Sequence, residues 1–116
     1  MMKMKILVSM LLVSSLLSSQ VGANNDGNIN GTIKGVYNYS YIEGLQLYWS
    51  DDAVGQTVCA GSNQMTIRGG DANGKSMISM AYTALSTGFK LHCTAKSGCS
   101  GINYSAEANY CYMSRE

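Results

Sequence analysis

The sequence predicts a mainly β fold with one helix, a small five-stranded barrel stapled by two disulfide bonds. Three observations lead to this prediction. Five short segments alternate polar and apolar residues with the period of a strand, and one longer segment repeats apolar residues with the 3.6-residue period of a helix. Four cysteines stand in a chain of 116 residues, an even number that is typical of small disulfide-bonded domains.

The first 23 residues have the composition of a secretory signal peptide. Lysines precede an apolar run of about a dozen residues, and Val21 and Ala23 suit the signal peptidase. The run is shorter than the roughly 20 residues of a membrane-spanning helix. We therefore expect a secreted or periplasmic protein without stable membrane insertion. Its signal peptide, 1–23, would be followed by a flexible N-terminal arm, 24–30, and one domain, 31–116.

The charge of the expected mature chain excludes one class of partner. Residues 24–116 contain six Lys and Arg against seven Asp and Glu, a side-chain net charge of −1, and these charges are scattered. Nucleic-acid and anionic-lipid surfaces are bound by clustered basic residues. No nucleic-acid partner is expected.

The strand signals begin after the expected arm. Alternation with aromatic enrichment predicts a strand from Thr32 to Tyr41 or Ile42, a tight turn at Glu43-Gly44, and a returning strand over 45–49. The region 50–62 is rich in turn residues and is expected to be a loop with at most a short extended piece at 58–60. Three further strands are expected at 64–68, 89–94 and 108–113.

A helix is the strongest local prediction. It begins after Asp71 or Asn73 as N-cap, ends at Ser86 or Thr87, and is followed by Gly88 in the position of a left-handed cap. Its apolar stripe consists of Met77, Ile78, Ala81, Ala84 and Leu85. The resulting order β-β-β-α-β-β is that of an OB-fold, a small Greek-key barrel. A ferredoxin-like fold or a simple α+β sandwich remains open.

The cysteine positions favour one disulfide pairing. If the last two strands form a hairpin centred near Ile102, Cys93 faces Cys111 at a distance suited to a disulfide. Cys59 would then pair with Cys99. The alternative pairing, 59–93 with 99–111, remains open because spacing alone does not fix connectivity. A structural zinc site is disfavoured because no closely spaced cysteine pair is present.

The sequence lacks the motifs of common catalytic sites. The single histidine, His92, lies on a predicted strand beside Cys93, which we expect to be oxidised. The adjacent Asp51 and Asp52 lie in a glycine-containing loop, where turn formation is the simpler role. No metal, cofactor or enzymatic activity is expected.

Tyrosine is the unusual feature of the composition. Eight tyrosines accompany one phenylalanine and one tryptophan. A tyrosine combines a flat apolar ring with a polar hydroxyl, which suits stacking on sugar rings or burial at an interface. The alternative is that these rings form the core and the sheet surface. The candidate ligand-binding residues of the first hairpin are Tyr37, Tyr39, Ser40, Tyr41, Tyr48 and Trp49.

One segment resembles a known family. The stretch GKSMISMAYTALSTGFKL, residues 74–91, resembles the helix, turn and strand of the binding subunits of AB5 toxins, especially the subtilase-cytotoxin and typhoid-toxin (pertussis-like) branch. It is also similar to small exported bacterial proteins of unassigned function. The positions of Cys59 and Cys99 are similar to those of the family.

The resemblance implies an OB-fold and a pentameric ring. It further implies a host or cell-surface glycan as ligand and a toxin A-subunit as partner. The expected function is therefore an exported, non-catalytic glycan-binding module. The alternative is a monomeric accessory or inhibitor protein that binds a protein partner.

Overall fold

The structure, a computed structural model, describes residues 25–116. The expected signal peptide and its cleavage site lie outside these residues. The elements in chain order are β1 (Gly27–Gly31), β2 (Ile33–Asn38), β3 (Gly44–Trp49), β4 (Val54–Thr57), β5 (Gln64–Arg68), α2 (Ala72–Thr87), β6 (Lys90–Ala95), the short 3-10 helix η1 (Ile102–Tyr104) and β7 (Ala106–Ser114).

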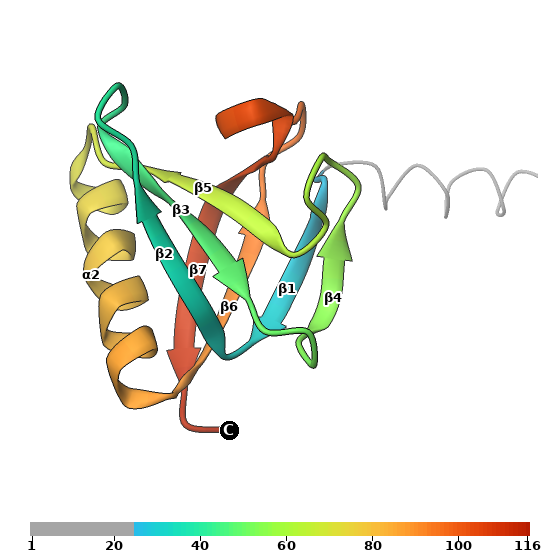
Figure 1. Ribbon diagram of the computed structural model, residues 1–116, viewed down its shortest axis with the longest axis vertical. Coiled ribbons are helices and arrows are strands. Elements are labelled where there is room, and N and C mark those ends of the chain that lie inside the picture. The colour runs from blue at the N-terminus through green and yellow to red at the C-terminus, as the bar shows by residue number, and fades with distance from the viewer. Residues whose placement is uncertain (1–24) are drawn as a thin grey trace, which may run out of the picture.

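The seven strands form a single sheet that curls into a half barrel, and α2 packs along one side of it (Figure 1). Across the sheet the order is β2-β3-β5-β7-β6-β1-β4. All neighbouring strands are antiparallel except β5 and β7, which are parallel. The mainly β fold with one α-helix is confirmed for the described residues. The predicted five-strand order is not matched, because five strands rather than three precede the helix.

The two additional strands arise where a flexible arm and a loop were expected. The arm prediction is wrong from Gly27 onward, because β1 pairs with both β4 and β6 and buries Ile29 completely. The loop prediction is wrong at Val54–Thr57, which forms β4 against β1. Both strands are short and rich in Asn, Gly and Gln, residues of low β-propensity. They exist because distant segments provide hydrogen-bonding partners.

The predicted helix is confirmed, including both caps. The Asp71 Oδ1 atom accepts a hydrogen bond from the Gly74 N–H at 2.7 Å, and Gly88 is left-handed with φ of 76°. A Cβ atom at Gly74 would lie 1.8 Å from the Arg68 carbonyl oxygen, so this close approach of helix and strand requires glycine. The apolar stripe is narrower than expected, because Leu85 is 40% exposed. No helix within residues 25–116 is long and apolar enough to cross a membrane.

Both predicted disulfide bonds are present. Cys93 and Cys111 are directly opposite each other on β6 and β7, with Cα atoms 4.1 Å apart. Cys59 is bonded to Cys99 across 40 residues of sequence. The alternative pairing is therefore excluded, and the residues are not available as a four-cysteine zinc site.

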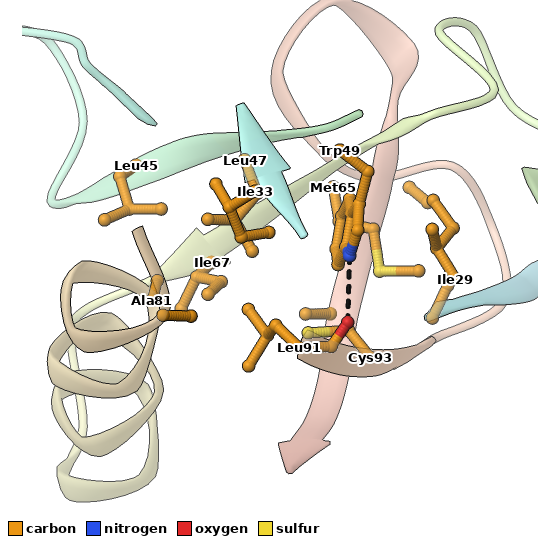
Figure 2. Close-up of a cluster of buried hydrophobic side chains, with 14 residues drawn as sticks. Ile29, Ile33, Leu45, Leu47, Trp49, Met65, Ile67, Ala81, Leu91 and Cys93 are labelled. Atoms are coloured by element: carbon orange, nitrogen blue, oxygen red, sulfur yellow. Dashed lines mark hydrogen bonds between the residues drawn. The ribbon is translucent and has the colours of Figure 1, made fainter. Parts of the chain in front are cut away.

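The core fills the concave side of the sheet and is crossed by one hydrogen bond (Figure 2). The Trp49 side chain is fully buried, and its Nε1 atom donates to the Leu91 carbonyl oxygen at 2.9 Å. Because Trp49 lies on β3 and Leu91 on β6, strands that are not neighbours, this bond connects two parts of the curled sheet. Around it pack the buried side chains of Ile29, Ile33, Leu45, Leu47, Met65, Ile67 and Cys93.

The substitution Trp49→Phe is expected to destabilise the fold by about 2 kcal/mol or more. It leaves the buried Leu91 carbonyl without its side-chain donor and creates a cavity, and each effect is costly. Urea unfolding followed by circular dichroism measures the loss. The control is Val58→Ala, at a side chain that is 81% exposed, where a change within about 0.5 kcal/mol is expected. Equal unfolding midpoints for the two variants would contradict this role of Trp49.

Candidate ligand-binding surface

The tyrosines of the β2–β3 hairpin gather on one surface. Two of them lie on the strands and two lie in the turn that connects the strands. The rings of Tyr37 on β2 and Tyr48 on β3 are in edge-to-face contact, with centroids 4.7 Å apart. Tyr39 and Tyr41 lie beyond the end of β2, and their ring centroids are 5.6 Å apart. We call these four residues the tyrosine patch.

The patch combines exposed and half-buried rings. Tyr37 is 55% exposed and Tyr41 is 68% exposed, whereas Tyr39 and Tyr48 are half-buried. Ser40 is exposed in the turn between them. The prediction that Trp49 belongs to this surface is wrong, because its side chain is fully buried in the core. Its side chain follows the inward parity of Leu45 and Leu47, opposite to Tyr48.

The hairpin turn is longer than predicted, and Tyr39 and Tyr41 therefore lie in the turn instead of on β2. The strand β2 ends at Asn38 instead of at Tyr41 or Ile42, and the turn occupies residues 39–43. It is anchored to the sheet, because the Gly69 N–H donates to the Glu43 carbonyl oxygen at 2.7 Å. The strand β3 begins at Gly44, where φ is 158° and a Cβ atom would lie 2.2 Å from the Ile67 carbonyl oxygen.

One further tyrosine adjoins the patch from the helix. The Asn38 Nδ2 atom donates to the Tyr82 hydroxyl oxygen at 2.7 Å, which places this α2 side chain beside the end of β2. Tyr82 is 43% exposed. Sequence reasoning missed this residue because it lies 44 positions from Asn38 and only the packing of α2 on β2 brings the two together.

The described residues contain one three-residue group with metal-ligating atoms. It consists of Asp26, Cys59 and Cys99, whose ligating atoms lie within 4.8 Å of one another. Because the two sulfurs are bonded to each other, the thiolates that a metal ion requires are not available. The Asp26 carboxylate instead accepts a hydrogen bond from the Cys99 N–H at 2.9 Å. The group is a structural anchor for the loop after β6.

One open hollow of the described surface is mainly polar. Its volume is about 410 Å³, and it is lined by Ser50, Asp51, Ala53, Gly55, Gln56, Ser62 and Asn63. Asp51 and Asp52 form a turn, as predicted, and Asp51 pairs with Lys34 at 3.4 Å. His92 lies outside this hollow, on β6, where its ring stacks on Tyr112.

The surroundings of the tyrosine patch raise the pKa of the Tyr48 hydroxyl. Burial raises the pKa of Tyr48 above its ordinary value of 10.0, and the neighbouring Tyr39 and Tyr37 raise it further. Between pH 10 and this raised pKa, the unfolded chain loses the Tyr48 proton while the folded chain retains it. The free energy of unfolding therefore falls as the pH rises through this window.

The substitution Tyr48→Phe is expected to remove this pH-dependent fall in the free energy of unfolding. Urea unfolding of wild type and variant at pH values from about 8 to 11 measures it. The stability difference between the two proteins should be constant below about pH 9 and should shift in favour of the variant above pH 10. Parallel stability curves over the whole range would show that the Tyr48 hydroxyl is not perturbed.

Comparison with known proteins assigns no family to this chain: no family model, no curated protein and no solved structure matches it. What the patch binds is therefore inferred from the chain's own residues.

Proposed function

We propose that this protein is an exported, non-catalytic binding module whose tyrosine patch contacts a glycan. The observation that carries the proposal is the gathering of Tyr37, Tyr39, Tyr41 and Tyr48 on one hairpin, with two of the rings more than half exposed. Large exposed aromatic groups are costly to leave in water, and their clustering marks interaction surfaces. The lysine-flanked apolar leader and the two disulfides support export.

The chemistry of the patch suits a sugar ring. The face of a tyrosine ring offers an apolar surface to the C–H groups of a pyranose, while its hydroxyl group both donates and accepts hydrogen bonds. The exposed polar groups of Ser40 and Asn38 border the patch. The anchored turn holds these side chains in place before a ligand arrives, which reduces the ordering cost of binding.

The strand connections support an OB-type barrel as the scaffold. The strands β1 and β2 are separated only by Thr32, so they can be counted as one strand, and β4 can be counted as an addition to it. The five strands in chain order are then β1 with β2, β3, β5, β6 and β7. Their neighbours around the sheet run first, second, third, fifth and fourth and return to the first, and the third and fifth strands, β5 and β7, are parallel. Counted in this way, the order corresponds to the one expected of an OB-fold, whose surface commonly binds oligosaccharides or oligonucleotides, and this supports the proposal.

A glycan array probed with protein purified after export tests the proposal. Wild type is expected to bind a defined subset of glycans, and Tyr41→Ala is expected to weaken that binding at least about tenfold, or 1.4 kcal/mol. Tyr41 is exposed in a turn, so its removal should change the stability by less than about 0.5 kcal/mol. Tyr41→Phe, which keeps the ring, separates stacking from hydrogen bonding by the hydroxyl.

The matched control is Tyr104→Ala, at a tyrosine that is 81% exposed on η1 and lies outside the patch. It is expected to retain wild-type glycan binding. Absence of glycan binding by wild type, or equal losses for the two alanine variants, would contradict the proposal. Saturable binding of a protein by the same patch would instead favour an accessory or inhibitor role.

A further inference from the structure

A second surface with ligand-binding chemistry lies on the outer side of β4, β1, β6 and β7, which are neighbours in the sheet (Figure 1). Alternation turns Ile29 and Cys93 into the core and turns the residues on either side of them outward. The strand register aligns these outward side chains in two rows. The rows are Val54, Asn30, His92 and Tyr112, and Gln56, Asn28, Thr94 and Tyr110, which we call the outer face.

The two rows of the outer face present flat rings, and the exposed Lys90 lies beside them at the next outward position of β6. The His92 ring stacks on the Tyr112 ring, with centroids 4.7 Å apart and planes inclined by 13°. Tyr112 is 51% exposed and Tyr110 is 53% exposed. Neither row contains Asp, Glu, Lys or Arg, whereas amide side chains occupy three of the eight positions. A neutral ligand with a flat apolar face and many hydrogen-bonding groups is complementary to this surface.

Two polar atoms in the first row indicate that the ligand carries a hydroxyl group. Asn30 and His92 are directly paired across β1 and β6. The Asn30 Oδ1 and His92 Nδ1 atoms are both buried and have no hydrogen-bond partner within residues 25–116. A buried polar atom without a partner costs about 1–3 kcal/mol. A hydroxyl group is able to donate to Asn30 Oδ1 and also to form a hydrogen bond with His92 Nδ1, because it is both donor and acceptor.

We propose that the outer face is a second saccharide-binding site. The ring of a neutral sugar stacks on the tyrosines of β7, and one sugar hydroxyl is bound between Asn30 and His92 after a rotation of the imidazole ring. The ligand class rests on the proposed function, but the site itself is separate. The tyrosine patch lies on β2, β3 and the turn between them, and β5 stands between these strands and β7 in the sheet.

The test is a titration of ¹⁵N-labelled protein, purified after export, with lactose, maltotriose and triacetylchitotriose, followed by NMR. At least one of these sugars is expected to shift the amide resonances of β1, β6 and β7 and the imidazole resonances of His92. Tyr112→Ala is expected to weaken this response at least tenfold, and Asn30→Ala several-fold. Tyr112→Phe retains the ring and should retain most of the affinity, which controls for misfolding.

Tyr41→Ala distinguishes the two sites. If Tyr41→Ala retains the sugar-induced resonance shifts of the outer face, the outer-face site is supported even where the tyrosine patch fails to bind glycans. If Tyr112→Ala binds every sugar as wild type does, or if no sugar shifts the outer face, this proposal is overturned while the patch is unaffected. Concentration-dependent shifts of the same resonances without sugar would show that the outer face is a contact between two copies of the chain, and would also overturn it.

Discussion

A single residue, Thr32, imposes the curvature on which the rest of the structure depends. It connects β1 and β2, yet these strands occupy nearly opposite positions in the sheet, sixth and first. One residue of extended chain spans only about 3.3 Å, so the two sides of the sheet must curl toward each other. Thr32 is fixed in turn by Ser50, which donates its N–H to the Thr32 carbonyl oxygen at 3.0 Å. The enclosed core and the distinction between inner and outer faces follow from this connection.

The weakest part of the curled sheet is reinforced by buried polar side chains. The parallel pair β5–β7 has only two aligned residue pairs. Beside it, the buried Gln46 amide donates to Ser105 Oγ at 3.1 Å, and the Thr66 hydroxyl donates to the Gln46 side-chain oxygen. Thr66 Oγ1 also accepts from the Ile102 N–H at 2.9 Å. A satisfied polar network of this kind favours one register over alternatives, which a purely apolar contact would not.

The features that could be predicted from the sequence are the local ones. The helix and its caps depend on residues within a few positions of one another, and the Cys93–Cys111 bond follows from the symmetry of one hairpin. By contrast, β1 and β4 have compositions typical of loops, and only their pairing with distant strands makes them part of the sheet. No local pattern records such a pairing.

The same distinction applies to the binding surfaces. The clustering of Tyr37 with Tyr48 could be predicted because both lie on one hairpin. The prediction that Trp49 shares a surface with its neighbour Tyr48 is wrong because successive residues of a strand face opposite sides. The pairing of Asn30 with His92 spans 62 positions and depends on the unpredicted β1, so the sequence carries no signal for it.

The bond between Cys59 and Cys99 has a consequence for proteolysis. It encloses β5, α2 and β6 within one covalent loop, whereas Cys93–Cys111 encloses η1 and most of β7. A protease that cuts the backbone once anywhere between positions 60 and 98 therefore releases no fragment, since the two pieces stay linked through sulfur. Such a nicked molecule retains its covalent continuity until the disulfide is reduced.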